Sequence, residues 1–171
     1  MCFKRFLGPQ TQCKHVYSDN SAEILGAMEK LGILNDTATP YRPETNGVIQ
    51  RANRRIKEGT SCVLVQAGLV EDWFPEAIPY FCFARCIKDI LVGGKTAWEL
   101  RFNCKFPGPD IPMGCEVHYL PIKDSDKART HKYGSKLLPG LFFGYSQHAG
   151  GGWDGDLLVV DQEQLASDVR A

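Results

Sequence analysis

The residues that could do chemistry lie in two neighbouring stretches near the start of the chain. Residues 17–24 read YSDNSAEI, in which Asp19 follows a short run of strand-forming residues. Residues 38–59 read ATPYRPETNGVIQRANRRIKEG and combine a turn-rich segment with several basic residues. A carboxylate at a strand end is an oxygen ligand of the kind that divalent cations prefer, and clustered arginines can neutralise phosphates. The first question is whether Asp19 is a metal ligand and where its partners lie.

Apolar spacing and turn residues predict the elements that must position Asp19. Residues 15–18 favour a buried strand that ends at Asp19. Ser21 is suited to cap the helix that follows, and Gly32 is suited to end it. The predicted order is a strand over residues 15–18, a helix over 22–31, a second strand from 33, an ordered loop over 36–47 and a long helix from 48 to about 66.

The second half of the chain predicts helices followed by short strands. The aromatic stretch over residues 73–91 indicates one or two helices, kinked or begun at its prolines. A Pro-Gly turn near residue 109 indicates a boundary between modules. β-prone runs follow at residues 115–122, 137–145 and 157–160, as in a small barrel. The predicted domains are an α/β unit over residues 1–109, a β module over 110–165 and a frayed tail over 166–171.

The composition indicates the charge balance of the protein, the redox state of its cysteines and whether a membrane span is expected. The 20 Lys and Arg residues balance 20 Asp and Glu residues, so any surface that binds nucleic acid must be local. The seven cysteines have no regular spacing and no apolar signal segment precedes them, which indicates reduced thiols inside a cell. No apolar run of about 18 residues predicts a membrane span, so no membrane partner is expected.

The candidate residues also have purely structural explanations. Asp19 considered alone would most simply cap the next helix. A zinc site is not predicted, because Cys82 and Cys86 lack further ligands and are expected to be buried free thiols. A solvated helix face and contacts to DNA phosphates remain equally open for four basic residues of the long helix, which are Arg51, Arg54, Arg55 and Lys57.

The ordered combination of motifs resembles a known family. An acid after a strand, then PYRPETNGVIQRANRRIKEG, WFPEA and LLPGLFFGYS resembles the integrase of Copia-type retrotransposons, most closely over residues 17–58. The resemblance implies a partial ribonuclease-H-like integrase core over residues 1–109 and an SH3-like β-barrel module over 110–165. In that family three carboxylates hold two divalent metals, Mg²⁺ or Mn²⁺, for 3′-end processing and strand transfer on DNA.

The resemblance assigns roles to particular residues. Asp19 matches the second acid of the family and would be a catalytic metal ligand, whereas Gln50 occupies the position of the third acid. The first acid belongs to an earlier strand, which nothing in residues 1–13 matches, so the chain is expected to be truncated at the front. Gln50 offers a neutral carbonyl oxygen, so metal binding should be weak. Asn46 would lie beside the active site, and the four basic residues of the long helix would contact DNA.

These observations lead to one prediction and one alternative. The prediction is a protein of DNA integration by descent, with retroelement ends and target DNA as partners, possible homo-oligomers and a nuclear location. Its polynucleotidyl transfer should be impaired or lost. The alternative is a non-catalytic DNA-binding or protein-binding fragment of a retroelement polyprotein.

Overall fold

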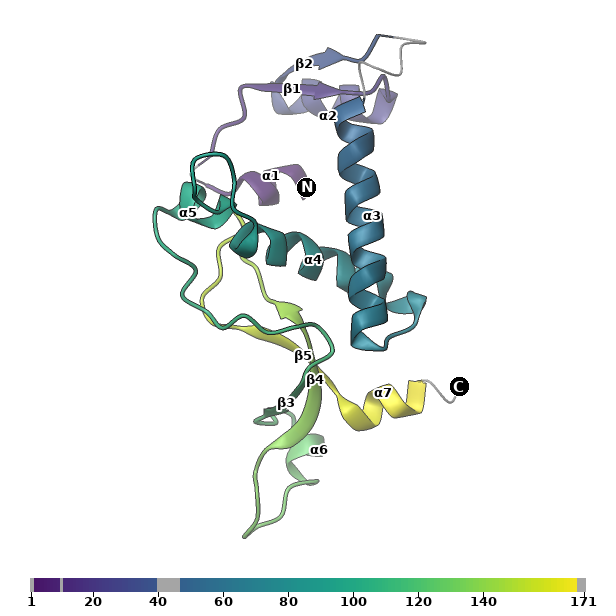
Figure 1. Ribbon diagram of the computed structural model, residues 1–171, viewed down its shortest axis with the longest axis vertical. Helices are drawn as coiled ribbons and strands as arrows, with labels where there is room; N and C mark the ends of the chain where they lie inside the picture. Colours follow the sequence, from purple (N-terminus) through teal and green to yellow (C-terminus); the bar gives the residue numbers. More distant parts are fainter. Residues whose placement is uncertain (1, 10, 40–46, 169–171) are drawn as a thin grey trace. The chain divides into compact units, whose positions relative to one another are not determined.

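The chain folds as a mixed α/β structure with two small sheets. Figure 1 shows the computed structural model, which describes residues 2–9, 11–39 and 47–168. Two compact units are present and are described separately. The first comprises Met1–Arg55 with Gln147–Asp154, and the second comprises Ile56–Ser146 with Gly155–Ala171. The α/β class is thereby confirmed, while the ribonuclease-H-like core and the SH3-like barrel stay predictions.

The first unit contains a parallel pair of strands joined by a helix. Its elements are α1 (Cys2–Leu7), β1 (His15–Ser18), α2 (Ala22–Leu31) and β2 (Leu34–Thr37). Strands β1 and β2 pair in parallel, as the intervening helix allows. Gly32 ends α2 in a left-handed conformation with φ 66°, as predicted. Strand β1 is not the buried strand we expected, because Ser18 is its one buried residue and a sheet of two strands covers little surface.

Helix α3 (Gly47–Ala67) confirms the predicted long helix. Its buried residues, Thr60 and Leu64, lie one turn apart in its second half. Apolar residues at positions 49, 52, 56, 63 and 64 predict an inward apolar stripe along this helix, but Ala52 is exposed. The apolar stripe is therefore buried only toward the C-terminal end of the helix, and the first turns are largely solvated.

The second unit combines helices with an antiparallel sheet. Its elements are the 3₁₀-helix η2 (Glu71–Trp73), α4 (Phe74–Lys88), α5 (Ala97–Phe102), β3 (Glu116–Tyr119), α6 (Asp124–Lys127), β4 (Leu138–Tyr145), β5 (Leu157–Asp161) and α7 (Gln162–Asp168). The strand order is β3-β4-β5, and all three predicted β-prone runs form strands. Helix α4 runs through Pro79 without ending. Its other proline, Pro75, lies in the first turn, where no helical hydrogen bond is lost.

Aromatic side chains form the core of the second unit, where α4 packs against β4. Phe142 is 0% exposed, and the ring of Tyr145 lies 4.7 Å from that of Phe83 on α4. Phe83 also packs edge-on against Trp98 of α5 and against Phe106, at 5.8 and 5.5 Å. Such edge-to-face pairs are preferred aromatic geometries. Four segments that are distant in sequence therefore share one core.

The predicted domain boundaries stay predictions, beside which the observed units and helix ends can be set. The predicted boundary at residue 109 falls inside the second unit, which contains both α4 and β4. The predicted frayed tail began at residue 166, but α7 continues to Asp168. The start of α7 has a physical cause, since the Asp161 side chain accepts hydrogen bonds from backbone N–H groups in its first turn. Residues 169–171 lie outside the described part.

Gly59 provides a stability test of the contact between α3 and α4. A Cβ atom at Gly59 would lie 2.0 Å from Cζ of Phe81, so Gly59→Ala requires the ring to move. Overpacking costs about 1–3 kcal/mol, whereas the gain in helix propensity is about 1 kcal/mol. We expect Gly59→Ala to lower the free energy of unfolding, measured in urea, by about 1 kcal/mol on this balance.

Gly26 is the matched control, because it lies inside α2 and nothing lies within 4 Å of a Cβ built there. Gly26→Ala should raise the free energy of unfolding by about 0.5–1 kcal/mol. If Gly59→Ala stabilised the protein as Gly26→Ala does, the packing of Phe81 on α3 would be wrong.

Candidate nucleic-acid interface

Asp19 lies directly after β1 and is exposed. Its Oδ1 accepts a hydrogen bond from the backbone N–H of Ser21 at 3.3 Å, which fixes the turn into α2. Ser21 occupies the predicted N-cap position, but its hydroxyl donates to Oε2 of Glu23 at 2.6 Å and does not cap the helix. Asp19 therefore has a local structural role of the kind that its sequence context also suggested.

Polar side chains hold the backbone around Asp19 at the end of the parallel sheet. The Ser18 hydroxyl donates to Oδ1 of Asn35 at 3.2 Å, which joins the ends of β1 and β2. The Asn20 amide donates to the carbonyl of Ala38 at 3.1 Å, and the Ala38 N–H donates to the carbonyl of Ser18 at 2.9 Å. Asp19 is thus displayed from a well-bonded edge, as a carboxylate ligand would need to be.

The described residues do not fit a two-metal site. No group of three His, Cys, Asp or Glu side chains comes together within them to hold a metal ion. Gln50 is exposed on α3 and brings no negative charge. Asn46 and Glu44 lie outside the described residues. Asp19 and Gln50 alone are a poor donor set for two hard cations, which take mainly carboxylate oxygens.

The first turns of α3 present a basic face. Its four cations and Gln50 are all exposed, and 3.6 residues per turn places them within an arc of roughly 160° around the helix axis. The buried residues of this helix, Thr60 and Leu64, lie further along it, beyond the last of these cations. Within the described residues, none of the four cations forms an ion pair. The members of this face are Gln50, Arg51, Arg54, Arg55 and Lys57, and we call them the α3 basic face.

The α3 basic face suits phosphate contact better than it suits chemistry. Arg51 and Lys57 are separated by about 9 Å along the helix axis at 1.5 Å per residue. Duplex DNA carries one charge per roughly 1.7 Å of its axis, so a row of this length meets several phosphates. Glu58 shares the same side of the helix and offsets part of the charge. The face can bind a polyanion without reading its sequence.

The sequence analysis missed a buried carboxylate at Asp161. One of its oxygens accepts hydrogen bonds from the Tyr119 hydroxyl at 2.6 Å and the Arg129 guanidinium at 2.9 Å, while the other caps α7. Burial opposes ionisation, but the hydrogen bonds from Tyr119 and Arg129 outweigh it and lower the pKa of Asp161 to about 2. An Asp before a helix-forming run is a local capping signal, but no local pattern reveals partners 42 and 32 residues away.

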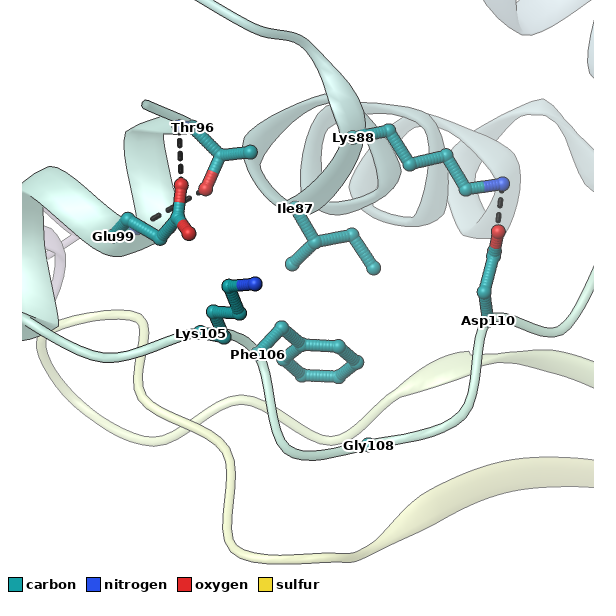
Figure 2. Close-up of a pocket in the computed structure, with 8 residues that line it drawn as sticks. All are labelled: Ile87, Lys88, Thr96, Glu99, Lys105, Phe106, Gly108 and Asp110. Atoms are coloured by element: carbon teal, nitrogen blue, oxygen red, sulfur yellow. Dashed lines mark hydrogen bonds and ion pairs between the residues drawn. The ribbon is translucent and has the colours of Figure 1, made fainter. Parts of the chain in front are cut away.

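A small cavity in the second unit is lined by charged side chains that already have hydrogen-bond or ion-pair partners. Figure 2 shows Thr96 and Glu99 bonded to each other on one side, and Lys88 bonded to Asp110 on the other. The volume is about 290 Å³. The Thr96 N–H lowers the pKa of Glu99, and Asp110 raises the pKa of Lys88. Because these charges stabilise one another, the cavity is secondary to the α3 basic face as a candidate site.

Comparison with known proteins finds retroviral relatives for part of the chain. No model of a known protein family matches it. The chain is 29% identical over 93 residues, or 51% of its length, to the Pol polyprotein of equine infectious anemia virus strain Wyoming. The same values hold for isolates 1369 and CL22. The match covers 8% of these curated polyproteins, so the chain spans less than a tenth of their length. About half of the chain is therefore similar to a retroviral Pol polyprotein.

A solved structure shows a more distant likeness. A chain of the simian T-cell lymphotropic virus intasome in complex with PP2A regulatory subunit B56 gamma aligns with a TM-score of 0.40 and 18% identity. The alignment covers 86% of this chain and 55% of that chain. Separately, none of the described helices is long and apolar enough to cross a membrane.

Asp161 makes the stability of the second unit dependent on acid. Its folded pKa of about 2 lies below the unfolded value of about 3.9, so the stabilisation is present above about pH 4 and is lost as the pH falls toward 2. We expect Asp161→Asn to lower the free energy of unfolding by about 2 kcal/mol at pH 7. In urea titrations the difference in free energy of unfolding between Asp161→Asn and the unchanged protein should shrink steadily between pH 4 and pH 2.

Asp124→Asn is the control for this prediction, since the Asp124 side chain is 97% exposed and its carboxylate pairs with Lys127 on the surface. It should change the free energy of unfolding by less than about 0.5 kcal/mol at either pH. A difference between Asp161→Asn and the unchanged protein that does not vary with pH would contradict the assigned pKa.

Proposed function

We propose that the chain derives from a retroelement integrase and binds DNA through the α3 basic face, without efficient metal-dependent transfer. The observation that carries the proposal is the exposure of four cations on one side of a long helix, none of which forms an ion pair within the described residues. Two findings support the origin: the similarity of half the chain to a retroviral Pol polyprotein, and the Copia-type order of motifs from Asp19 to Tyr145.

Binding of this kind would be governed by counterion release. Each cation that contacts a phosphate frees a condensed counterion, so affinity falls as salt rises. Four contacts give a slope of about −3.6 in a plot of log K against log salt concentration for duplex DNA. Contacts to phosphates fix position on the duplex but carry no base information. The proposed ligand class is therefore DNA bound with little sequence preference.

The proposal assigns the loss of chemistry to Gln50. In the family that the sequence resembles, a ribonuclease-H-like core aligns acids around Mg²⁺ or Mn²⁺, and an SH3-like module follows it. Bound metal supplies activation of the attacking oxygen and neutralisation of the phosphate charge. With Asp19 as one carboxylate and Gln50 as a neutral neighbour, metal should be held weakly. Homo-oligomers and a nuclear location follow from the same proposed origin.

A salt titration tests the DNA-binding proposal. We expect the chain to bind a fluorescent duplex at low salt, and Arg54→Ala/Arg55→Ala to make the log-log slope shallower by about 2. Asp19→Asn should bind at least as well as the unchanged chain, because it removes a negative charge and no phosphate contact. Fluorescence anisotropy at several potassium chloride concentrations gives the slopes.

Lys14→Ala/Lys30→Ala is the matched control, since it removes two exposed positive charges of the first unit from outside α3. Its slope should stay within about 0.5 of the unchanged chain, where two lost phosphate contacts would give about 2. An equal loss in both double variants would mean that the net charge, rather than the α3 basic face, determines binding.

A strand-transfer assay tests the loss of chemistry. Purified chain incubated with end-labelled duplex and Mg²⁺ or Mn²⁺ should form no more joined product than Asp19→Asn does, because one carboxylate cannot hold two metals. Joined product from the unchanged chain that disappears in Asp19→Asn would refute this part of the proposal. The DNA-binding measurement would stand independently of that result.

A further inference from the structure

A second cavity in the second unit has an apolar wall and two thiols. Its volume is about 250 Å³, which is below the roughly 300–1,000 Å³ of sites for drug-sized ligands and suits a group of one ring. The thiols belong to Cys82 and Cys86 of α4. The apolar lining residues are Ile56, Phe81, Leu91 and Ala97.

The two thiols are placed to act together. Cys82 and Cys86 lie four residues apart on one helix, which sets their Cβ atoms about 5–6 Å apart on the same face. Both are free cysteines that line the same cavity, and Cys86 is exposed while Cys82 is half-buried. A ligand can therefore enter from the side of Cys86 and reach both sulfur atoms. No His, Asp or Glu joins them in a metal-binding group within the described residues.

The charge beside the thiols is already compensated. The Arg85 guanidinium donates to Oδ2 of Asp89 at 2.6 Å and lies 5.9 Å from the centre of the Phe81 ring. Burial raises the pKa of the Cys82 thiol and also that of the Cys86 thiol. The site therefore presents two protonated thiols with no net charge, which disfavours a bound species that would leave a charge behind.

We propose that Cys82 and Cys86 form a dithiol site that chelates one thiophilic, trivalent ligand of the class RAs(OH)₂, with a small apolar R group seated in the cavity. Two S–H bonds and two As–OH bonds break, two As–S bonds form, and two waters leave. No electron transfer is needed and the product is neutral. Sulfur ligands prefer soft partners of this kind, and the second bond closes intramolecularly at high effective concentration.

A ligand of this class would use both the two thiols and the apolar wall of the cavity. The paired thiols provide the chelate, and the cavity provides apolar surface for a ring. A hard divalent cation would use neither, since it needs oxygen ligands and keeps water. This inference is independent of the DNA-binding proposal, because it rests on α4 and uses no residue of the α3 basic face.

Phenylarsine oxide, which hydrates to the proposed class, is the test ligand. The reduced full chain is treated with it in the presence of excess glutathione, and intact mass spectrometry counts the adducts. We expect one phenylarsenic unit per chain in place of two hydrogens, stable to glutathione and released by dithiothreitol. Peptide mapping after alkylation should show Cys82 and Cys86 protected relative to untreated protein, while Cys62 and Cys104 stay accessible.

Cys82→Ala and Cys86→Ala should each weaken glutathione-resistant binding at least tenfold, and Cys62→Ala, an exposed thiol on α3, is the matched control that should leave it unchanged. Circular dichroism verifies that the variants are folded, and the protection map needs no variant at all. The proposal is overturned by the absence of a resistant adduct, by protection at other cysteines, or by full binding in folded Cys82→Ala.

Discussion

The packing of α4 against β4 is the contact on which the second unit depends. Phe83 of α4 and Phe142 of β4 are 3% and 0% exposed, and Tyr145 lies against both rings. Each such aromatic pair contributes roughly 0.5–1.5 kcal/mol beyond the area it buries. Trp98 and Phe106 join the same cluster, so the short helix α5 and the segment after it are held by a core that neither could form alone. Hydrogen bonds from Tyr80 to the Ile111 carbonyl and from Tyr145 to the Pro109 carbonyl secure that segment further.

Helix α4 also contacts the second half of α3. The ring of Phe81 on α4 lies against the backbone of α3 at Gly59, where no side chain could fit without displacing it. Thr60 and Leu64, which lie one turn apart, are buried in the same half of the helix. Arg51, Arg54 and Arg55 precede this part of the helix and are exposed. The buried residues of α3 and its exposed cations therefore occupy successive parts of one helix.

Local signals were enough to predict most helices and strands. Contacts between residues far apart in the sequence could not be predicted from them. Gly32 as a helix stop and the runs that became β3, β4 and β5 were visible in the sequence, because turn chemistry and apolar spacing act within a few residues. The degree of burial of these elements was not visible in the sequence, since β1 was expected to be buried and lies largely exposed. The partners of Asp161 could not be found either, because Tyr119 and Arg129 reach it only through the fold. Of the candidate site, the basic residues were predicted as a set on one helix, but their exposure was established only by the structure.

The residue at position 50 affects both metal binding and the binding of a polyanion. Gln50 and Arg54 are one helical turn apart, a spacing at which a carboxylate would pair with the arginine and reduce its availability to a phosphate. With bound metal the charge of such a carboxylate would be compensated, so an acid at this position suits a metal site. Without metal, a neutral glutamine leaves Arg54 fully cationic on an exposed face. A neutral residue at position 50 therefore weakens the case for metal chemistry and strengthens the case for binding a polyanion, and the two properties would change together rather than independently.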